Sequence, residues 1–149
     1  MGARLALVGD GDQLAAARAL ALPGVSCAGA STDVRPWLAA ADVAVFPSRW
    51  EGLSLTVLEA FALGRGVVVS DIPGLAEVVT PEVGATVPAE QPVALAAAVA
   101  ERLLDPVLAG REGAAAARHA VRFDHRLTFD QLAAETTAVV SGRKELATW

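Results

Sequence analysis

Cysteine is almost absent from this sequence, because Cys27 is the only one among 149 residues. This excludes a disulfide framework and a cysteine-based metal site, and a lone thiol with apolar neighbours is expected to be a small packing residue. No apolar run approaches the roughly 18 residues that a membrane-spanning helix needs, so we expect no membrane span. The start, Met1–Arg4, has no signal-peptide pattern, which by default predicts a cytoplasmic protein.

Blocks of lysine or arginine are missing as well. The formal net charge is -5 at pH 7, whereas nucleic-acid-binding surfaces depend on clustered cations that neutralise phosphates. We therefore predict no nucleic-acid partner. An anionic ligand would have to be bound locally, by the backbone N–H groups at the N-terminus of a helix.

Short runs rich in Val and Leu alternate with longer alanine-rich stretches, which is the pattern of βαβ units and a parallel sheet. The length suits one domain, which we place at residues 1–141 with a tail at 142–149. None of the expected strands shows polar alternation, so both faces of the sheet should be covered. The expected strands are Arg4–Val8, Val25–Ala28, Val43–Pro47, Gly66–Ser70 and Ala85–Val87.

Helices are expected between the strands and after the last one, with ordinary Asp, Ser and Gly caps. Their expected ranges are Asp12–Leu22, Val34–Ala41, Ser54–Leu63, Leu75–Val79, Pro92–Leu104, Leu108–Val121 and Asp124–Ser141. Three helices thus follow the last strand. The predicted fold class is α/β, with a doubly wound parallel sheet of about five strands in a Rossmann-like or flavodoxin-like order.

The segment Pro47–Ala60 holds the candidate site. It begins at the carboxyl end of an expected strand and passes through a turn into a helix, and ligands of open α/β sheets bind at the carboxyl ends of strands. A helix that starts near Ser54 leaves the first N–H groups, those of Ser54, Leu55 and Thr56, without partners inside the helix. A diphosphate suits that position.

Two glutamates flank this helix start. Glu51 lies in the loop before it and Glu59 lies about one and a half turns into it. Paired carboxylates of this kind suit sugar hydroxyls. In the alternative interpretation neither glutamate binds a ligand. Glu51 is then only an acid whose position before the helix is favoured by the helix dipole, and Glu59 is a solvated helix residue. The apolar stretch Leu58–Leu63 favours a partly buried Glu59 that needs a partner.

The Glu-x7-Glu pattern of Glu51 and Glu59 is preceded by Ala41–Ser48 and followed by Gly64–Asp71. In these residues the chain resembles the C-terminal domain of the group-1 retaining glycosyltransferases of GT-B architecture. The resemblance covers nearly the whole chain. It also includes the strand-turn Leu7–Gly11, the short acidic helix Gly74–Val79 and the late helix Pro92–Leu104.

The resemblance implies that the donor substrate is a nucleoside-diphosphate sugar. It implies that Glu59 hydrogen-bonds the ribose hydroxyls and that Glu51, the catalytic candidate, touches the transferred sugar. Transfer in this family is metal-independent, so neither a metal nor a separate cofactor is expected. The expected donor-binding residues are Gly9, Arg49, Leu53, Ser54, Leu55, Thr56 and Glu59, with the N–H groups of Leu53, Ser54 and Leu55 on the diphosphate.

The chain departs from the family's pattern. The family's domain begins with one more strand, followed by an Arg and a Lys that clamp the diphosphate, and Arg49 is the nearest substitute here. The acceptor-binding domain is also absent. We therefore expect a donor domain that is inactive alone and needs an acceptor domain or a second chain. The alternative is a scaffold or oligomerising module, such as a homodimer, without useful donor binding.

The missing strand would be central in the Rossmann-like order 3-2-1-4-5-6, so its loss leaves a gap. In one solution, Arg4–Val8 pairs directly with Val43–Pro47 and the order becomes flavodoxin-like, 2-1-3-4-5. In the other, a second chain supplies a strand or a face. We expect the direct pairing.

Four further side chains are interpreted as structural. His119 and His125 lack an acid or cysteine at ligand spacing and are expected at the surface. Trp37 and Trp50 are expected to pack, although Trp50, next to Glu51, would also be placed to wall the donor pocket.

Overall fold

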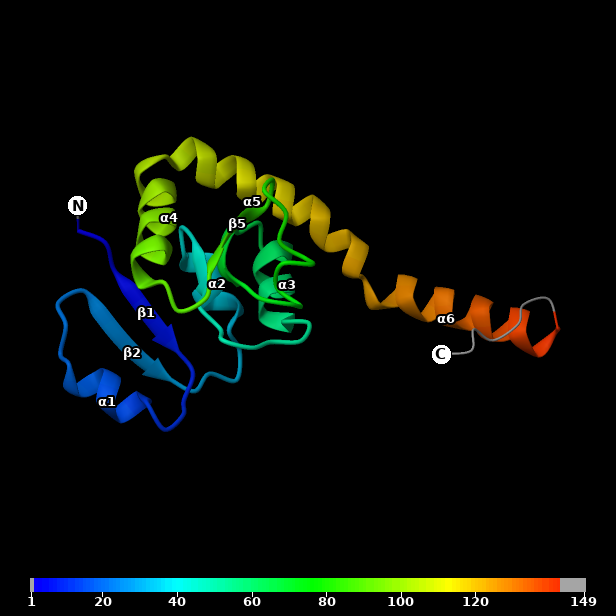
Figure 1. Ribbon diagram of the computed structural model, residues 1–149, viewed down its shortest axis with the longest axis horizontal. Coiled ribbons are helices and arrows are strands. Elements are labelled where there is room, and N and C mark those ends of the chain that lie inside the picture. The colour runs from blue at the N-terminus through cyan, green and yellow to red at the C-terminus, as the bar shows by residue number, and fades with distance from the viewer. Residues whose placement is uncertain (1, 143–149) are drawn as a thin grey trace.

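Five strands alternate with helices in the computed structural model, which describes residues 2–142 (Figure 1). The strands are β1 (Leu5–Val8), β2 (Val25–Gly29), β3 (Ala44–Phe46), β4 (Val67–Asp71) and β5 (Gly84–Pro88). The helices are α1 (Leu14–Ala19), α2 (Arg35–Ala40), α3 (Leu55–Ala62), α4 (Pro92–Leu104), α5 (Pro106–Ala120), the 3-10 helix η1 (Val121–Phe123) and α6 (His125–Val140). Apart from end residues, the expected strands and all but one of the expected helices are confirmed.

The exception is the expected helix Leu75–Val79, which is a pair of consecutive turns. Gly74 has a positive φ of 84° and so breaks the helical path. The N–H groups of Ala76 and Val79 each donate to a carbonyl four residues back, those of Ile72 and Leu75, but no continuous ladder joins these two bonds. The α/β class is nevertheless confirmed, with every strand pair parallel.

The strands form two separate parallel sheets, β1–β2 and β3–β4–β5. The expected direct pairing of Arg4–Val8 with Val43–Pro47 is therefore wrong. Different contacts hold the two sheets: α2 lies against α3 and accepts a hydrogen bond from Arg65 at the Ala39 carbonyl, whereas β2 contacts β1 and α1. These contacts tie α2 to the three-stranded sheet, and residues 30–34 connect β2 to α2.

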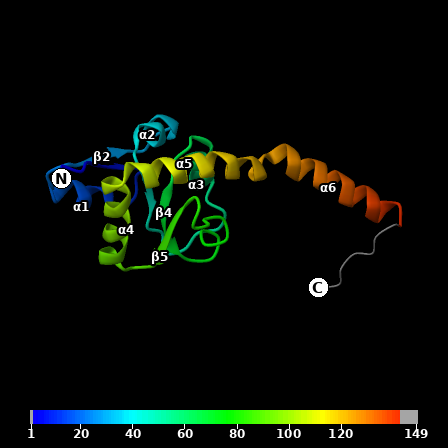
Figure 2. The same cartoon turned by 90° about the horizontal axis from the view of Figure 1, so that it is seen from above.

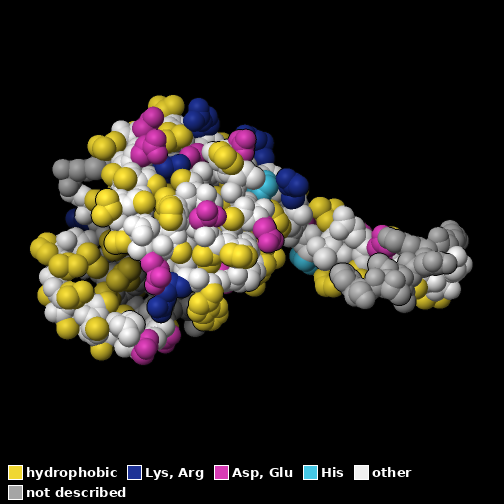
Figure 3. All heavy atoms as spheres, in the orientation of Figure 1, with side chains coloured by type: hydrophobic (Ala, Val, Ile, Leu, Met, Phe, Trp, Pro, Cys, Tyr) yellow, Lys and Arg dark blue, Asp and Glu magenta, His cyan; other side chains and the backbone are white. Residues whose placement is uncertain are grey.

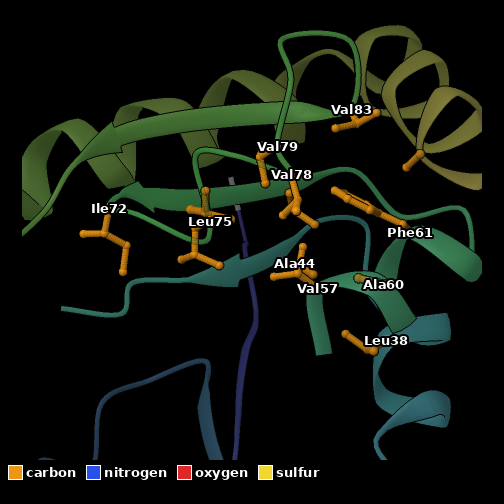
Figure 4. Close-up of a cluster of buried hydrophobic side chains, with 13 residues drawn as sticks. Leu38, Ala44, Val57, Ala60, Phe61, Ile72, Leu75, Val78, Val79 and Val83 are labelled. Atoms are coloured by element: carbon orange, nitrogen blue, oxygen red, sulfur yellow. The ribbon is translucent and has the colours of Figure 1, made fainter. Parts of the chain in front are cut away.

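The core belongs to the three-stranded sheet. Val67, Val68 and Val69 of β4 are fully buried, as is Phe61 of α3. Full burial of such a side chain stabilises a fold by about 1.5–3 kcal/mol. Figure 4 shows side chains of α3, β3 and the segment before β5 pointing toward one another. The core cluster contains Leu38, Ala44, Val57, Ala60, Phe61, Val67, Val69, Ile72, Leu75, Val78, Val79, Val83 and Ala116.

The β1–β2 unit lacks such a core. Among residues 2–33 only Gly29 is buried, and Leu5 and Leu7 are 46% and 39% exposed. The expectation that every strand is covered on both faces is therefore wrong for β1. Both ribbon views place the β1–β2–α1 unit at the end of the molecule opposite α6 (Figures 1 and 2).

Helix α6 projects away from the body in both views. None of its residues is buried. Its N-terminus is capped by the Asp124 carboxylate, which accepts the Arg126 N–H at 2.9 Å and pairs with the Arg126 guanidinium at 2.6 Å. The hydrogen bonds from Arg126 lower the pKa of Asp124 to about 2. The helix start is thus determined locally rather than by packing.

A buried ion pair joins α4 to α5. The Arg102 guanidinium donates to both carboxylate oxygens of Glu112, at 2.9 and 2.7 Å, and both side chains are nearly inaccessible. The Nη1 amino group of Arg102 donates to the Ala98 carbonyl and to the exposed Glu101 carboxylate. Every charge in this group has a partner, as a buried charge requires.

We predict that Glu112→Ala lowers the free energy of unfolding by about 3 kcal/mol, because it leaves the buried Arg102 charge with only Glu101. Urea denaturation measures this loss. The double variant Arg102→Met/Glu112→Leu should recover most of it, since no charge remains buried. Asp33→Asn, which weakens an exposed ion pair, is the control and should leave the urea midpoint nearly unchanged. Equal stability of Glu112→Ala and the parent would contradict the prediction.

Candidate functional site

The N-terminus of α3 opens at the carboxyl end of β3. Ser54 has extended backbone angles and precedes the helix, and its hydroxyl makes no capping hydrogen bond. The Ser54 carbonyl accepts from the Leu58 N–H, which is the first bond of the helix. The N–H groups of Leu55, Thr56 and Val57 therefore precede the helical ladder, as expected for a helix that starts here.

Solvent reaches this helix start. Leu53 and Leu55 are 55% and 70% exposed, whereas Ser54 is buried with 7% exposure. The leucine side chains thus point outward, and Val57 and Phe61 on the inner side of α3 anchor the helix in the core. An anion above β3 would meet backbone N–H groups and the positive end of the α3 dipole.

The loop that carries Glu51 is held by a close backbone approach from Gly74. A Cβ atom on Gly74 would lie 2.8 Å from the Glu51 carbonyl oxygen and would collide with the Gly52 carbonyl oxygen. Only glycine fits this position, where φ is also positive. Glu51 is half-buried, while its neighbour Trp50 is 85% exposed.

Glu59 lies on the exposed side of α3, so the expected partial burial of its carboxylate is wrong. Its charge nevertheless acts on Arg35 at the start of α2. Hydrogen bonds and charge attraction from Asp33 raise the pKa of Arg35, and Glu59 raises it further to a smaller extent. The same ion pair, with a 2.8 Å contact, lowers the pKa of Asp33.

Arg35 was not among the residues predicted for the site. The sequence contains a signal for it, since Asp33 and Arg35 follow the carboxyl end of the second strand and Arg35 begins the next helix. The packing of α2 on α3 depends on tertiary contacts. Arg49, the cation that was predicted for the site, is exposed in the loop after β3.

Gly9 lies on the other sheet. It follows β1, its N–H donates to the Gly29 carbonyl at 2.8 Å, and its φ is 135°. A Cβ there would meet nothing within 4 Å, so the turn is open. Figure 1 shows the loop after β1 and the loop before α3 on the same lower side of the molecule. The predicted residues therefore belong to two units separated by the break in the sheet.

Three of the four side chains that were interpreted as structural lie in other environments than expected. Trp37 is 41% exposed, and with the exposed Trp50 this contradicts the expected packing of both. His119 is half-buried between the rings of Phe61 and Phe123, with Nε2 3.1 Å from the Val78 carbonyl, so its expected surface position is wrong. The exposed His125 is at the surface as expected.

The fold and the position of this helix start define a Rossmann-like α/β domain. A sequence model of the family described as glycosyl transferases group 1 matches residues 2–105. The chain belongs to this family of glycosyltransferases, as the resemblance implied. Within residues 2–142, no helix combines the length and apolar character needed to cross a membrane.

Three curated proteins are similar to part of this chain. The chain is 43% identical over 88 residues to the lipopolysaccharide core biosynthesis mannosyltransferase LpcC of Rhizobium leguminosarum bv. viciae, covering 58% of this chain and 25% of that protein. It is 39% identical over 113 residues to the glycogen synthase of Mycobacterium tuberculosis, with 73% and 26% covered. It is 37% identical over 102 residues to the D-inositol 3-phosphate glycosyltransferase of Thermobispora bispora, and this match covers 68% of this chain and 24% of that protein. The chain thus spans about a quarter of these relatives.

Solved structures show the same fold. The sucrose-phosphate synthase of Thermosynechococcus elongatus superposes with a TM-score of 0.77 at 29% identity, covering 91% of this chain and 39% of that one. HepE of Anabaena, solved in complex with UDP, has a TM-score of 0.79 at 22% identity, with 92% and 41% covered. The Rossmann-like fold of GT-B glycosyltransferases is therefore confirmed.

We predict that Gly74→Ala displaces the loop of Glu51 and Gly52 and destabilises the protein by about 1–3 kcal/mol, because the added methyl group collides with that backbone. Backbone NMR shifts of Glu51 and Gly52, together with urea denaturation, test this. Gly142→Ala is the matched control, since φ there is also positive, at 68°, but no atom lies near. Equal effects of the two variants would mean that backbone strain alone matters at Gly74.

Proposed function

We propose that this chain is the donor-binding part of a retaining glycosyltransferase that transfers a sugar from a nucleoside-diphosphate sugar to an acceptor. The observation that carries the proposal is the solvent-open N-terminus of α3 at the carboxyl end of β3, with Glu51 before it and Glu59 within it. Membership of the group-1 family supports the same reaction class.

In the proposed complex the diphosphate lies against the N–H groups at residues 53–56. Glu59 accepts hydrogen bonds from the ribose hydroxyls, and Glu51 contacts the transferred sugar. Preorganised N–H groups stabilise the charge that develops on the departing nucleoside diphosphate. Arg49 on the same loop is proposed as an additional phosphate contact, and Gly9 as the turn that faces the donor from β1.

Acceptor binding is proposed to depend on a further part of the enzyme. The chain spans about a quarter of its curated relatives, which include a mannosyltransferase and a glycogen synthase. Exclusion of water from the reacting centre requires a covered site, whereas this helix start is open to solvent. We propose that the chain acts in the cytoplasm and does not transfer sugar alone.

A second candidate function is an oligomerising scaffold of the same fold. Its support is the exposed apolar side chains of α6, where Phe129 and Leu132 are 64% and 61% exposed. This reading predicts self-association through α6, as in a homodimer, and no effect of the two glutamates.

We predict that the chain binds one of UDP, GDP and ADP, and that Glu59→Ala weakens this binding roughly tenfold to a hundredfold. The physical reason is the loss of hydrogen bonds to a charged acceptor, which contribute about 1.5–3 kcal/mol. Isothermal titration calorimetry measures the dissociation constants. Asp130→Asn, an exposed carboxylate on α6, is the control and should bind like the parent.

Two results would oppose the proposal. Binding by Glu59→Ala that equals the parent would remove Glu59 from the site. Absence of nucleotide binding combined with concentration-dependent self-association in sedimentation would favour the scaffold.

A further inference from the structure

A second pocket lies at the amino end of β5, away from the start of α3. Its volume is about 370 Å³, which is within the range of small-molecule pockets. Residues 80–83, which precede β5, form one wall, and the last turns of α5 with η1 form the other. Because the strands are parallel, this pocket and the carboxyl end of β3 lie at opposite ends of the sheet. Its polar lining consists of Thr80, Glu82, Arg118, His119 and Arg122.

Core contacts hold the two walls of this pocket together. Val83, which also lines it, is only 2% exposed. His119 packs edge-on between Phe61 and Phe123, with ring centroids 5.7 and 5.3 Å away. Its Nε2 lies 3.1 Å from the Val78 carbonyl, and since a carbonyl only accepts, Nε2 is the donor. This bond joins the end of α5 to the segment before β5, so the pocket has a determined shape.

Two arginines of this pocket have no acidic partner. Arg118 and Arg122 are exposed and four residues apart, so they lie on the same face of consecutive helical turns. Among residues 2–142, neither guanidinium forms an ion pair with a carboxylate. Figure 3 shows Lys and Arg side chains along the part of the molecule formed by α5. Like charges at this spacing repel each other, and an anion between them would accept hydrogen bonds from both.

Glu82 adds a hydrogen-bond acceptor to the same pocket. Hydrogen bonds from Thr80 and from its own backbone N–H lower the pKa of Glu82, so its carboxylate is ionised at neutral pH. An ionised carboxylate accepts hydrogen bonds but donates none. It therefore repels a bare phosphate and favours a ligand that also carries hydroxyl groups. The pocket thus combines cations for a phosphate with an acceptor for neighbouring hydroxyls.

We propose that this pocket binds a small, soluble phosphorylated ligand with hydroxyl groups, of the class of the sugar monophosphates. The guanidinium groups of Arg118 and Arg122 donate to the phosphate oxygens, whose geometry matches the planar guanidinium fork. Glu82 accepts hydrogen bonds from the hydroxyls. The site is separate from the N-terminus of α3, and its ligand is not the proposed nucleotide sugar.

Ribose 5-phosphate is the probe, in an NMR titration of the full chain at low ionic strength. We expect it to shift the backbone amides of Glu82, His119 and Arg122. It should bind about fivefold more tightly than inorganic phosphate, which has no hydroxyls for Glu82 to accept from. Ribose, which lacks the phosphate, should cause no shifts. Equal shifts at Arg111, an exposed arginine of α5 outside the pocket, would indicate nonspecific attraction of anions and would overturn the proposal.

Variants of the chain test each group of the pocket. Arg122→Gln should weaken the binding of ribose 5-phosphate about tenfold, because it removes charge-assisted hydrogen bonds. Arg111→Gln is the matched control and should bind like the parent. Equal urea midpoints check that both variants are folded. Unchanged binding by Arg122→Gln would mean that this arginine only complements the dipole at the C-terminal end of the helix, and would contradict the assignment.

The role of Glu82 has a readout of its own. Glu82→Ala should bind inorganic phosphate more tightly than the parent does, because a repelling charge is lost. It should also bind ribose 5-phosphate with little preference over inorganic phosphate, because the acceptor for the hydroxyls is gone. A preference that is as large as in the parent would remove Glu82 from the site.

Binding at this pocket is independent of the donor site. Glu59→Ala should bind ribose 5-phosphate like the parent, and Arg122→Gln should bind nucleoside diphosphates like the parent. Shifts at the amides of residues 53–56 instead of the pocket would place the probe at α3 and would overturn the proposal. Sedimentation of the chain with phosphatidylcholine vesicles that contain phosphatidic acid, lost in Arg122→Gln, would identify a lipid headgroup and contradict the soluble ligand.

Discussion

The burial of β4 is the constraint on which the rest of the structure depends. Its three valines are inaccessible between β3 and β5 and beneath the helices. Because β3 pairs with β4, the carboxyl end of β3 has a determined position, and the loop to α3 starts there. Because α3 buries Val57 and Phe61 against the same core, its open N-terminus points toward that loop. The position of the candidate site therefore follows from the packing of β3, β4 and α3 in the core.

Close backbone contacts complete this arrangement. The α-carbon of Gly74 lies against the carbonyls of Glu51 and Gly52, and Gly113 of α5 lies against the Gly64 carbonyl at the end of α3. Both contacts depend on the absence of a side chain. One holds the loop before α3 and the other holds the helix end after it. The helix start that faces the proposed diphosphate is therefore supported from two directions.

The N-terminal unit of β1, α1 and β2 is organised differently. It has almost no buried residues, and it is connected to the core mainly through the segment between β2 and α2. Its stability is expected to be lower than that of the β3–β5 body, because fewer apolar groups are removed from water. Gly9 belongs to this unit, so any ligand that contacts both Gly9 and α3 has to bridge the break in the sheet.

The sequence alone determined the order of strands and helices, the α/β class and the position of Glu51 and Glu59 around a helix start. These features depend on local hydrophobic patterns and caps, which act over a few residues. The tertiary structure decided which strands pair and the contact of Gly74 with the Glu51 loop. An apolar strand such as Leu5–Val8 has the same pattern whichever neighbour it pairs with, because backbone hydrogen bonding is independent of side chains. Its partner is decided by contacts between residues distant in the sequence, such as those that join β1 to β2.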